Sequence, residues 1–500
     1  MSTRPTNAPA ATSSPNSRST SSIVWGNRTT ARRMPRSSRR TTSRLLASLA
    51  RIPTFGLTRP ASQLRLREGA VLRTRRGHMT ISTERTSALP TATPDGRPLP
   101  LAGVRVVDFT WIVAGPQATR ILADFGADVI KVENESHLDS VRMGGSPADD
   151  AARFNSSGLF NNLNRNKRSL TINLFHPRGR ELLEELIAGA DAVTENFSPG
   201  AFERMGFGWD RLRELNPNII YMSLSGFGHL GRDSSYVTWG PTAQAISGLT
   251  YLSGLPDQPP AGWGYSYLDH SAGYYGAIGL MLALRKRSRE GGPLRVDLSQ
   301  AETGMVMTGA QMLDAQVNNR PSERSGNLLP YPEIAPHNTY RCAGEDRWIA
   351  LAVETDDHWA ALCDVLGADA LATDPRFGTN SGRVEAREEL DAAIDALTRG
   401  WDTRELMYAL QARGVPAGVA QTTEDKMELD PQLAARGFYP RADHPILGEH
   451  RFESLPFQLS RFGWHLRRGA PLLGEHSDDV LAELGCDEDE IARLREELAI

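Results

Sequence analysis

Residues 103–133, GVRVVDFTWIVAGPQATRILADFGADVIKVE, hold the pattern that decides the fold. The apolar run 103–109 is typical of a buried strand, and Ala114-Gly115-Pro116 then turns the chain into a helix predicted over Gln117–Phe125. Residues 126–133 give a second buried-strand pattern. A strand, a helix and another strand in this order form the unit from which parallel sheets are built.

The same alternation continues along the chain. Further strands are predicted at Ser169–Asn173, Ala192–Phe197, Ile219–Ser225 and Leu294–Leu298, and further helices at Pro177–Ala188, Trp209–Leu215 and Gln300–Ala310. We therefore predict an α/β fold with a doubly wound, mostly parallel, Rossmann-like sheet. Ligands of such sheets bind beyond the carboxyl ends of the strands.

Residues 325–430 differ in character from the residues before them. A polar, proline-rich linker spans 320–340, and a hairpin is predicted around the turn 343–346. Helices are predicted at His358–Leu366, Arg387–Thr398 and Thr403–Arg413. We therefore predict a large domain over 96–324, a smaller α+β domain over 325–430, and a return to the large domain over 431–500 that ends in an acidic amphipathic helix.

Residues 1–95 are predicted to be a disordered basic leader, because residues 1–78 have sixteen Arg, no Lys, one acidic residue and no sustained apolar period. Three interpretations stay open: an organellar transit peptide, a basic disordered arm, or an over-long reading frame whose true start is Met79. The last is favoured, since basic content made of Arg alone resembles unselected translation of a GC-rich stretch.

Composition excludes several classes of function. The chain has 56 basic and 60 acidic residues, so the part after residue 78 carries 40 against 59, a net charge of −19, which disfavours nucleic-acid binding. No run approaches the roughly 18 uncharged apolar residues of a membrane span, so no membrane contact is expected. The cysteines, Cys342, Cys363 and Cys486, are few and scattered, which predicts a reducing, cytoplasmic location. No cluster has metal-ligand spacing.

Residues 267–284 place one carboxylate at the start of a glycine-laced apolar helix. Asp269 is predicted to be the N-cap of this helix, where the first-turn amides would keep its carboxylate ionised. Gly273, Gly276 and Gly279 recur every third residue, so other backbone or a ligand could approach one face closely. From this pattern alone a plain helix cap is the commoner role, and a catalytic role is the alternative.

Three other motifs carry less information. Residues 226–231 spell GxGxxG, but neither an apolar-periodic helix nor an acidic residue about 20 positions on follows, so a strand-end loop is predicted rather than a dinucleotide site. Residues 195–200 end a predicted strand, where a ligand would lie or an ordinary Pro-Gly turn would form. Residues 164–168 form a basic, amide-rich loop that is either a solvated surface loop or a phosphate or nucleotide contact. His337 is predicted to be structural rather than catalytic.

Taken in order, these segments resemble the class III CoA-transferases, a family that includes formyl-CoA transferase, the carnitine CoA-transferases and α-methylacyl-CoA racemase. The resemblance runs from about Pro100 to Leu484. It is carried by residues 101–109, 114–116, 126–133, 166–169, 195–200, 204–207, 225–228 and 425–437.

The resemblance implies that Asp269 is the catalytic nucleophile, since it falls where the family has its aspartate. The implied reaction moves CoA from an acyl-CoA donor to a carboxylic acid acceptor, through an aspartyl mixed anhydride and an aspartyl-CoA thioester. It needs no metal or redox cofactor, because the CoA thioester is a substrate.

The resemblance also implies a CoA site, formed by Ile112, Lys167, Arg168, Ile172, Asn196, Phe197, Arg204 and Met205. Two positions depart from formyl-CoA transferase: Asn134 stands where that enzyme has an Arg, and Val237 where it has a Lys. Arg142 and Arg165 are therefore the candidates for the remaining phosphate contacts. The glycine-run flap of that enzyme is replaced by residues 326–337, which argues against an oxalate-sized substrate.

The implied assembly is an interlocked homodimer of ring-like subunits, or a heteromer with a related subunit. Two alternative functions remain open. One is an acyl-CoA racemase, although Trp239 stands where that branch has its second catalytic residue, a histidine. The other is a non-catalytic acyl-CoA-binding subunit of a heteromeric transferase.

Overall fold

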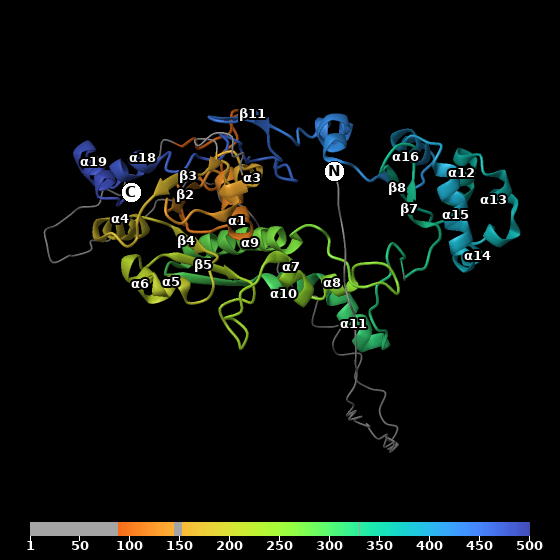
Figure 1. Cartoon of the computed structure of the whole chain (residues 1–500), viewed down its shortest axis with the longest axis horizontal. Coiled ribbons are helices and arrows are strands. Elements are labelled where there is room, and N and C mark those ends of the chain that lie inside the picture. Colours follow the sequence, from red (N-terminus) through yellow and green to blue (C-terminus); the bar gives the residue numbers. More distant parts are fainter. Residues whose placement is uncertain (1–88, 145–152, 330) are drawn as a thin grey trace, which may run out of the picture. The chain divides into compact units, whose positions relative to one another are not determined.

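A computed structural model of the chain describes residues 89–144, 153–329 and 331–500, and these belong to one compact unit that runs from Glu84 to Ile500 (Figure 1). Most of the predicted leader, with the proposed start at Met79, lies outside the described residues. Its last residues, 89–95, belong to the fold: Thr93 is buried, its amide donates to the carbonyl of Arg97 at 2.8 Å, and Leu99 donates to Thr91 at 2.8 Å.

Six strands form the central sheet: β1 (Arg105–Asp108), β2 (Asp128–Glu133), β3 (Arg168–Thr171), β4 (Ala192–Glu195), β5 (Ile220–Ser225) and β6 (Leu294–Ser299). Their order is β3-β2-β1-β4-β5-β6, and every neighbouring pair is parallel. This is the doubly wound order, in which the winding reverses between β1 and β4. The predicted fold class is confirmed.

The helices of this part of the chain are α1 (Ala114–Asp124), α3 (Gly158–Asn164), α4 (Pro177–Ala188), α5 (Ala201–Arg204), α6 (Trp209–Leu215), α7 (Gly240–Ile246), α8 (Leu249–Leu252), α9 (Tyr267–Glu290), α10 (Gln300–Met307) and α11 (Gly309–Asn318), with a 3₁₀ turn at Ser140–Gly144. Residues 226–239 form turns and bends before α7 begins, so the strand-end loop predicted for the GxGxxG motif is confirmed.

The next segment contains β7 (His337–Arg341), β8 (Trp348–Ala352) and β9 (Ala417–Val419), with α12 (Asp356–Leu366), α13 (Asp369–Thr373), η2 (Pro375–Phe377), α14 (Asn380–Glu385), α15 (Arg387–Thr398) and α16 (Thr403–Ala412). The strands form an antiparallel sheet in the order β7-β8-β9. Its buried face and the helices share a core of their own, built from residues between 335 and 417. The predicted hairpin is present, whereas β9 has no counterpart in the prediction.

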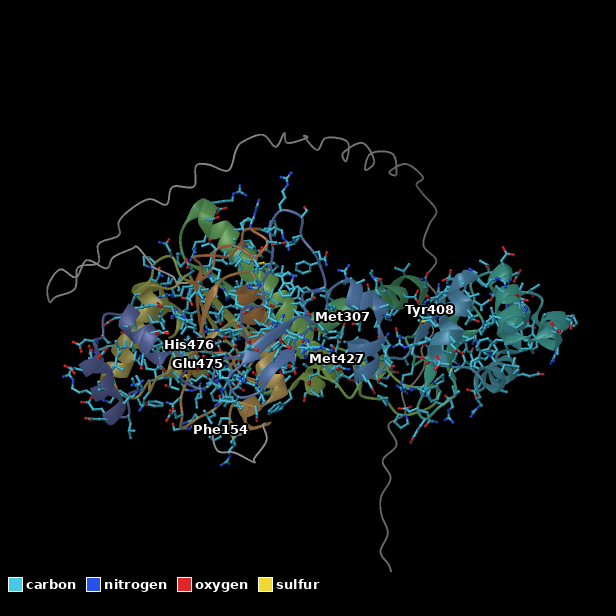
Figure 2. All side chains as sticks on the ribbon, turned by 90° about the horizontal axis from the view of Figure 1, so that it is seen from above. Phe154, Met307, Tyr408, Met427, Glu475 and His476 are labelled. Carbon is cyan, nitrogen blue, oxygen red and sulfur yellow. The ribbon has the colours of Figure 1, made fainter. Side chains whose placement is uncertain are left out.

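The C-terminal part contains a π-helical turn (Asp425–Leu429), α17 (Pro431–Ala435), the antiparallel pair β10 (Arg441–His444) and β11 (Gly448–Arg451), α18 (Ser477–Glu483) and α19 (Glu488–Glu496). It contacts the central sheet through side-chain and backbone hydrogen bonds. The imidazole Nδ1 of His476, labelled beside Glu475 in Figure 2, accepts from the amide of Ser169 on β3 at 3.3 Å. Asn173 donates to the carbonyl of Ala499 at 2.8 Å.

Two apolar layers enclose the central sheet, which fixes where its polar edge lies. On one face, Val107 and Val193 pack with α4, α5, α6, α18 and α19. On the other, Val106 and Ile220 pack with α1 and α9. Both faces are therefore closed, and the carboxyl ends of the parallel strands are the natural place for a ligand. Among the described residues, every helix is either too short or too polar to span a bilayer.

Candidate active site

The carboxyl ends of four adjacent strands gather at one edge of the central sheet. β1, β4, β5 and β6 end there at Asp108, Glu195, Ser225 and Ser299. α9 ends where β6 begins and packs along β5 and β6, so it runs antiparallel to these strands. Its first turn, with Asp269, therefore lies at the edge where the strands end. The loops that follow these strands and the start of α9, the helix that contains Asp269, therefore lie at the same edge of the sheet.

Asp269 is not the N-cap of α9, and the prediction was wrong on this point. The helix begins at Tyr267, its N-cap is Ser266, and Asp269 is the third helical residue. The earlier start buries Leu268 against Ala243 and Leu249. Asp269 therefore lies in the first turn, where the helix dipole still favours a negative charge.

The Asp269 carboxylate is half-buried, and its two oxygens have different surroundings. Oδ1 accepts a hydrogen bond from the Nε2 group of Gln300. Oδ2 lies against Gly240, where a Cβ atom would come within 2.4 Å of it. Burial raises the pKa of Asp269, although hydrogen bonds from Gln300 and Ser266 oppose the shift.

The glycine face of α9 contacts protein. A Cβ atom on Gly273 would lie 2.5 Å from the side chain of Gln117 on α1, and one on Gly276 would lie 3.1 Å from Ala118. A Cβ atom on Gly279 would lie 3.1 Å from Cγ1 of Val296 on β6. These glycines let α1 and the sheet approach α9, and this packing holds Asp269 in place.

The loops that carry Ile112 and Asn196 are tied together. The Asn196 side chain accepts from the backbone N–H of Trp111 at 2.7 Å and donates to its carbonyl at 2.9 Å. Ile112 has a left-handed backbone (φ 67°), and its N–H donates to Asp139 at 3.1 Å. Phe197 meets the Trp111 ring edge-on at 5.8 Å. A β-branched residue in this conformation is strained, which is common at ligand sites.

The predicted phosphate ligands Lys167 and Arg168 are both buried in ion pairs. Lys167 Nζ lies 3.0 Å from Asp108, and Arg168 Nη2 lies 2.7 Å from Asp128. Arg142 and Arg165 are likewise buried, each 2.7 Å from a carboxylate, of Glu133 and Asp124 respectively. These pairs give all four cations a structural role, and neither alternative for the 164–168 loop, a solvated loop or a phosphate contact, anticipated it. A CoA contact by any of them stays a prediction.

The remaining predicted CoA residues differ in exposure. Ile172 is 2 % exposed, in the core below α4. Met205 caps the C-terminus of α5 and packs partly against that core. Arg204 is exposed, and no carboxylate of the described residues lies within ion-pair distance of it. Its guanidinium folds back over Gly200, 3.1 Å from where a Cβ atom would stand. Arg204 is therefore the predicted cation that is free for a phosphate.

Glu195, absent from the predicted site residues, forms a buried polar cluster at the end of β4. Its carboxyl accepts from the hydroxyl of Tyr221 at 2.8 Å and from the N–H of Phe197 at 2.7 Å. Nε2 of His229 lies 3.7 Å from it and has no hydrogen-bond partner among the described residues. Burial raises the pKa of Glu195 to about 7. The sequence pattern of residues 195–200 marks a strand end, but it does not indicate that Glu195 is buried.

Glu195→Gln is expected to remove part of the pH dependence of stability. Ionisation of Glu195 costs more free energy in the folded protein than in the unfolded chain. Below about pH 4.5 the carboxyl is neutral in both states and the free energy of unfolding has its full value. This stability is lost as the pH rises through the folded-state pKa of about 7. The variant cannot ionise. Between pH 5 and pH 8.5, urea unfolding should show the variant gaining about 2 to 3 kcal/mol relative to wild type. Parallel pH profiles would mean that the carboxyl has an ordinary pKa.

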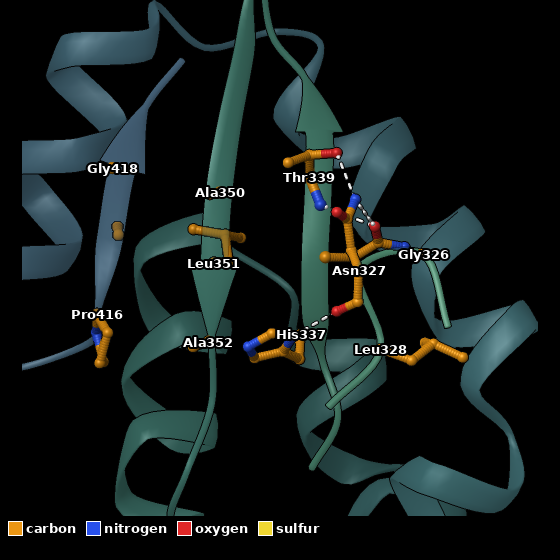
Figure 3. Close-up of a pocket in the computed structure, with 12 residues that line it drawn as sticks. Gly326, Asn327, Leu328, His337, Thr339, Ala350, Leu351, Ala352, Pro416 and Gly418 are labelled. Carbon is orange, nitrogen blue, oxygen red and sulfur yellow. Dashed lines mark hydrogen bonds between the residues drawn. The ribbon is translucent and has the colours of Figure 1, made fainter. Parts of the chain in front are cut away.

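A cavity of about 600 Å³ opens on the outer face of the β7-β8-β9 sheet (Figure 3). The residues that line it include His337, Thr339, Ala350, Ala352 and Asn327. Nδ1 of His337 donates to the carbonyl of Asn327 at 2.6 Å, a tie consistent with the structural role predicted for this histidine. None of the predicted catalytic or CoA-binding residues lines the cavity. Within the described residues, no group of three or more His, Cys, Asp or Glu could hold a metal ion.

Comparisons with known proteins agree on one family. Residues 101–477 match CoA-transferase family III. The chain is 35 % identical over 400 residues to the succinyl-CoA–D-citramalate CoA-transferase of Chloroflexus aurantiacus, covering 80 % of this chain and 97 % of that protein. It is 35 % identical over 346 residues to the succinate–glutarate CoA-transferase of Agrobacterium fabrum, covering 69 % and 85 %.

A solved structure supports the same assignment. The crystal structure of a CAIB/BAIF family protein from Brucella suis aligns with a TM-score of 0.71 at 34 % identity, covering 77 % of this chain and 99 % of that one. The family resemblance predicted from the strand, loop and helix motifs is confirmed. The chain belongs to CoA-transferase family III.

Proposed function

We propose that this protein transfers CoA from an acyl-CoA donor to a carboxylic acid acceptor, with Asp269 as the covalent nucleophile. One observation carries the proposal. Asp269 is a half-buried carboxylate at the carboxyl edge of the sheet, and no Lys, Arg or His of the described residues lies within ion-pair distance of it. A carboxylate that no cation neutralises is available to attack a thioester. Family membership supports the same chemistry.

In the first step an Asp269 oxygen attacks the thioester carbonyl of the donor. A C–O bond forms, the C–S bond breaks, and its electron pair leaves with CoA as a thiolate. The thiolate then attacks Cγ of the acylated Asp269, and the donor leaves as a carboxylate. An acceptor carboxylate reverses both steps: it displaces the thiolate from Cγ, and the thiolate takes the acceptor acyl group, restoring the Asp269 carboxylate. The steps balance without a metal or redox cofactor.

Arg204 and the tied loops supply the CoA contacts in this proposal. Arg204 would bind a phosphate, because it is exposed and unpaired within the described residues. Phe197 and Trp111, whose rings meet edge-on, present half-buried aromatic surface on the tied loops. The pantetheine arm then follows the strand ends from this region to Asp269.

Dicarboxylic acids are the first substrates that we propose. The relatives from Chloroflexus and Agrobacterium are named for succinyl-CoA with citramalate and for succinate with glutarate. The start of α9, near Asp269, also exposes aromatic rings, with Trp263 and Tyr267 4.9 Å apart and Tyr265 stacked on His270. A donor panel should therefore also include larger apolar acyl groups.

Intact mass spectrometry of the chain incubated with acyl-CoA donors tests the proposal. We expect adducts of acyl mass or CoA mass on the wild type and neither on Asp269→Ala, because both intermediates are bonded to Cγ of that residue. Succinyl-CoA is the first donor to try. If CoA binds and no donor gives an adduct, the covalent mechanism is wrong, and the racemase and partner-subunit alternatives gain weight.

The homodimer, or a heteromer with a related subunit, stays a prediction. Apolar side chains on α10 and α11 support a subunit contact, since Val306, Met312 and Val317 are each more than half exposed. An apolar surface of this kind is typical of protein interfaces.

A further inference from the structure

Gln300 reaches Asp269 from a different element of the fold. It is the first residue of α10, only 5 % exposed, and lies 31 positions further along the chain. Its backbone is well held. Ser299 caps the helix by accepting from the N–H of Glu302 at 3.3 Å, and the N–H of Ala301 donates to the carbonyl of Gly226 at 2.9 Å. The amide that meets Asp269 is thus carried by a fixed backbone rather than by a loose loop.

The contact makes the two Asp269 oxygens unequal. Nε2 of Gln300 donates to Oδ1, so one lone pair of that oxygen is engaged. The space beside Oδ2 exists because residue 240 is glycine, and any Cβ there would lie 2.4 Å from Oδ2 and 2.8 Å from Cγ. Because Gln300 donates to Oδ1 and not to Oδ2, we assign the attack on an acyl carbon to the oxygen in the Oδ2 position. The oxygen in the Oδ1 position stays beside a hydrogen-bond donor.

We propose that Gln300 is an oxyanion donor for the steps in which Asp269 is itself attacked. The inference rests on the proposed function. When the CoA thiolate attacks Cγ of the acylated Asp269, a C–S bond forms and the carbonyl electron pair moves onto Oδ1. The pair returns as the bond from Cγ to the bridging oxygen breaks and the donor carboxylate leaves. The N–H of Gln300 points at Oδ1, where the charge develops, before the reaction begins.

The two halves of the reaction should therefore depend on Gln300 to different degrees. In the first step the charge develops on the carbonyl oxygen of the substrate, whereas the N–H of Gln300 is directed at Oδ1 of Asp269. In the second step it develops on Oδ1 of Asp269. Removing one oxyanion donor typically costs about 10²-fold or more in rate. A residue that only held the fold together would slow both steps alike.

Gln300→Met tests this, because methionine is close to glutamine in length and lacks the donor. After rapid mixing with an acyl-CoA, quenched samples are read by intact mass. We expect the CoA-mass adduct to form about 10²-fold more slowly than in wild type, while the acyl-mass adduct, transient in wild type, accumulates. Gln432→Met, an exposed position on α17, is the matched control and should keep the wild-type rates.

Gln300→Glu guards against a packing artefact. It preserves the shape of the side chain but presents an oxygen where the donor stood, so it should accumulate the acyl adduct as Gln300→Met does. If Gln300→Glu forms the CoA adduct at the wild-type rate, or if Gln300→Met slows both steps equally, the role of Gln300 is overturned. If wild type itself gives no adduct that depends on Asp269, the proposed function fails, and this inference fails with it.

Discussion

Asp269→Asn is expected to lower kcat/KM for CoA transfer by at least about 10⁴-fold, the scale of loss seen when a covalent nucleophile is removed. Asparagine has the same shape, and its Oδ1 can still accept from Gln300. What it lacks is the anionic oxygen that forms the mixed anhydride. The surroundings of Asp269 offer no substitute: the ring of neighbouring His270 stacks on Tyr265 at 4.9 Å, and burial lowers its pKa.

The measurement is initial-rate kinetics of freshly purified enzyme with whichever donor gives the adduct. CoA binding should be retained, because the loops of Asn196, Phe197 and Arg204 are untouched. Asp257→Asn is the matched control: this carboxylate is exposed in a loop, has a left-handed backbone that asparagine tolerates, and lies outside the proposed machinery. An Asp269→Asn enzyme that keeps a tenth of wild-type activity would rule out the covalent mechanism.

Local sequence rules predicted the repeating elements well. α4 and α6 have the predicted bounds, Pro177–Ala188 and Trp209–Leu215. Pro177 is the first helical residue of α4, and Gly189 follows its last. Both are start and stop signals that can be recognised from the local sequence alone. The parallel order of the strands also follows, because strand–helix–strand units have few alternatives.

The start of α9 shows where such rules end. By local preference Asp269 is a good N-cap, yet the helix begins two residues earlier, at Tyr267. The earlier start buries Leu268 against Ala243 and Leu249 of the preceding helices. The position of the cap was thus decided by tertiary packing, which overrides a preference worth about 1 kcal/mol.

The role of the basic loop 164–168 was mispredicted, and Gln300 was missed, for a related reason. The carboxylates that neutralise Lys167 and Arg168 are Asp108 and Asp128, which lie 59 and 40 positions earlier in the chain. The sequence around residue 167 contains the cations but not the carboxylates that pair with them. A buried network of ion pairs therefore has the same local sequence as a phosphate-binding loop. Gln300 escaped notice because nothing near it in sequence marks it, whereas its contact lies on another helix.

Lys167→Met is expected to lower the free energy of unfolding by about 3 kcal/mol or more, because it leaves Asp108 buried without its closest cation. Lys167 is fully buried, and its ammonium donates to Asp108 at 3.0 Å, to the side chain of Asn164 at 2.9 Å and to the carbonyl of Pro116 at 3.2 Å. Burial lowers its pKa to about 8, although Asp108 opposes the shift.

The loss should come mainly from Asp108 rather than from the missing ammonium. Burial alone would raise the pKa of Asp108, but Lys167 and Lys131, with the hydroxyls of Thr110 and Thr119, hold it below its usual range. In Lys167→Met, Lys131 is the one cation of the described residues that still lowers the pKa of Asp108. Converting Asp108 to asparagine in the same chain removes the stranded charge, so the double variant should regain a large part of the stability.

Urea unfolding of wild type, both single variants and the double variant gives the coupling energy. Arg399→Met is the matched control, since Arg399, which follows the last residue of α15, is exposed and its pair with the partly exposed Asp395 should contribute less than about 1 kcal/mol. If Lys167→Met costs no more than this control, the ion pair does not hold the loop. Lys167 would then be free to leave Asp108, and the phosphate contact predicted for it would regain force. A large loss that the double variant repairs means that this lysine supports the strand ends on which the candidate site is built.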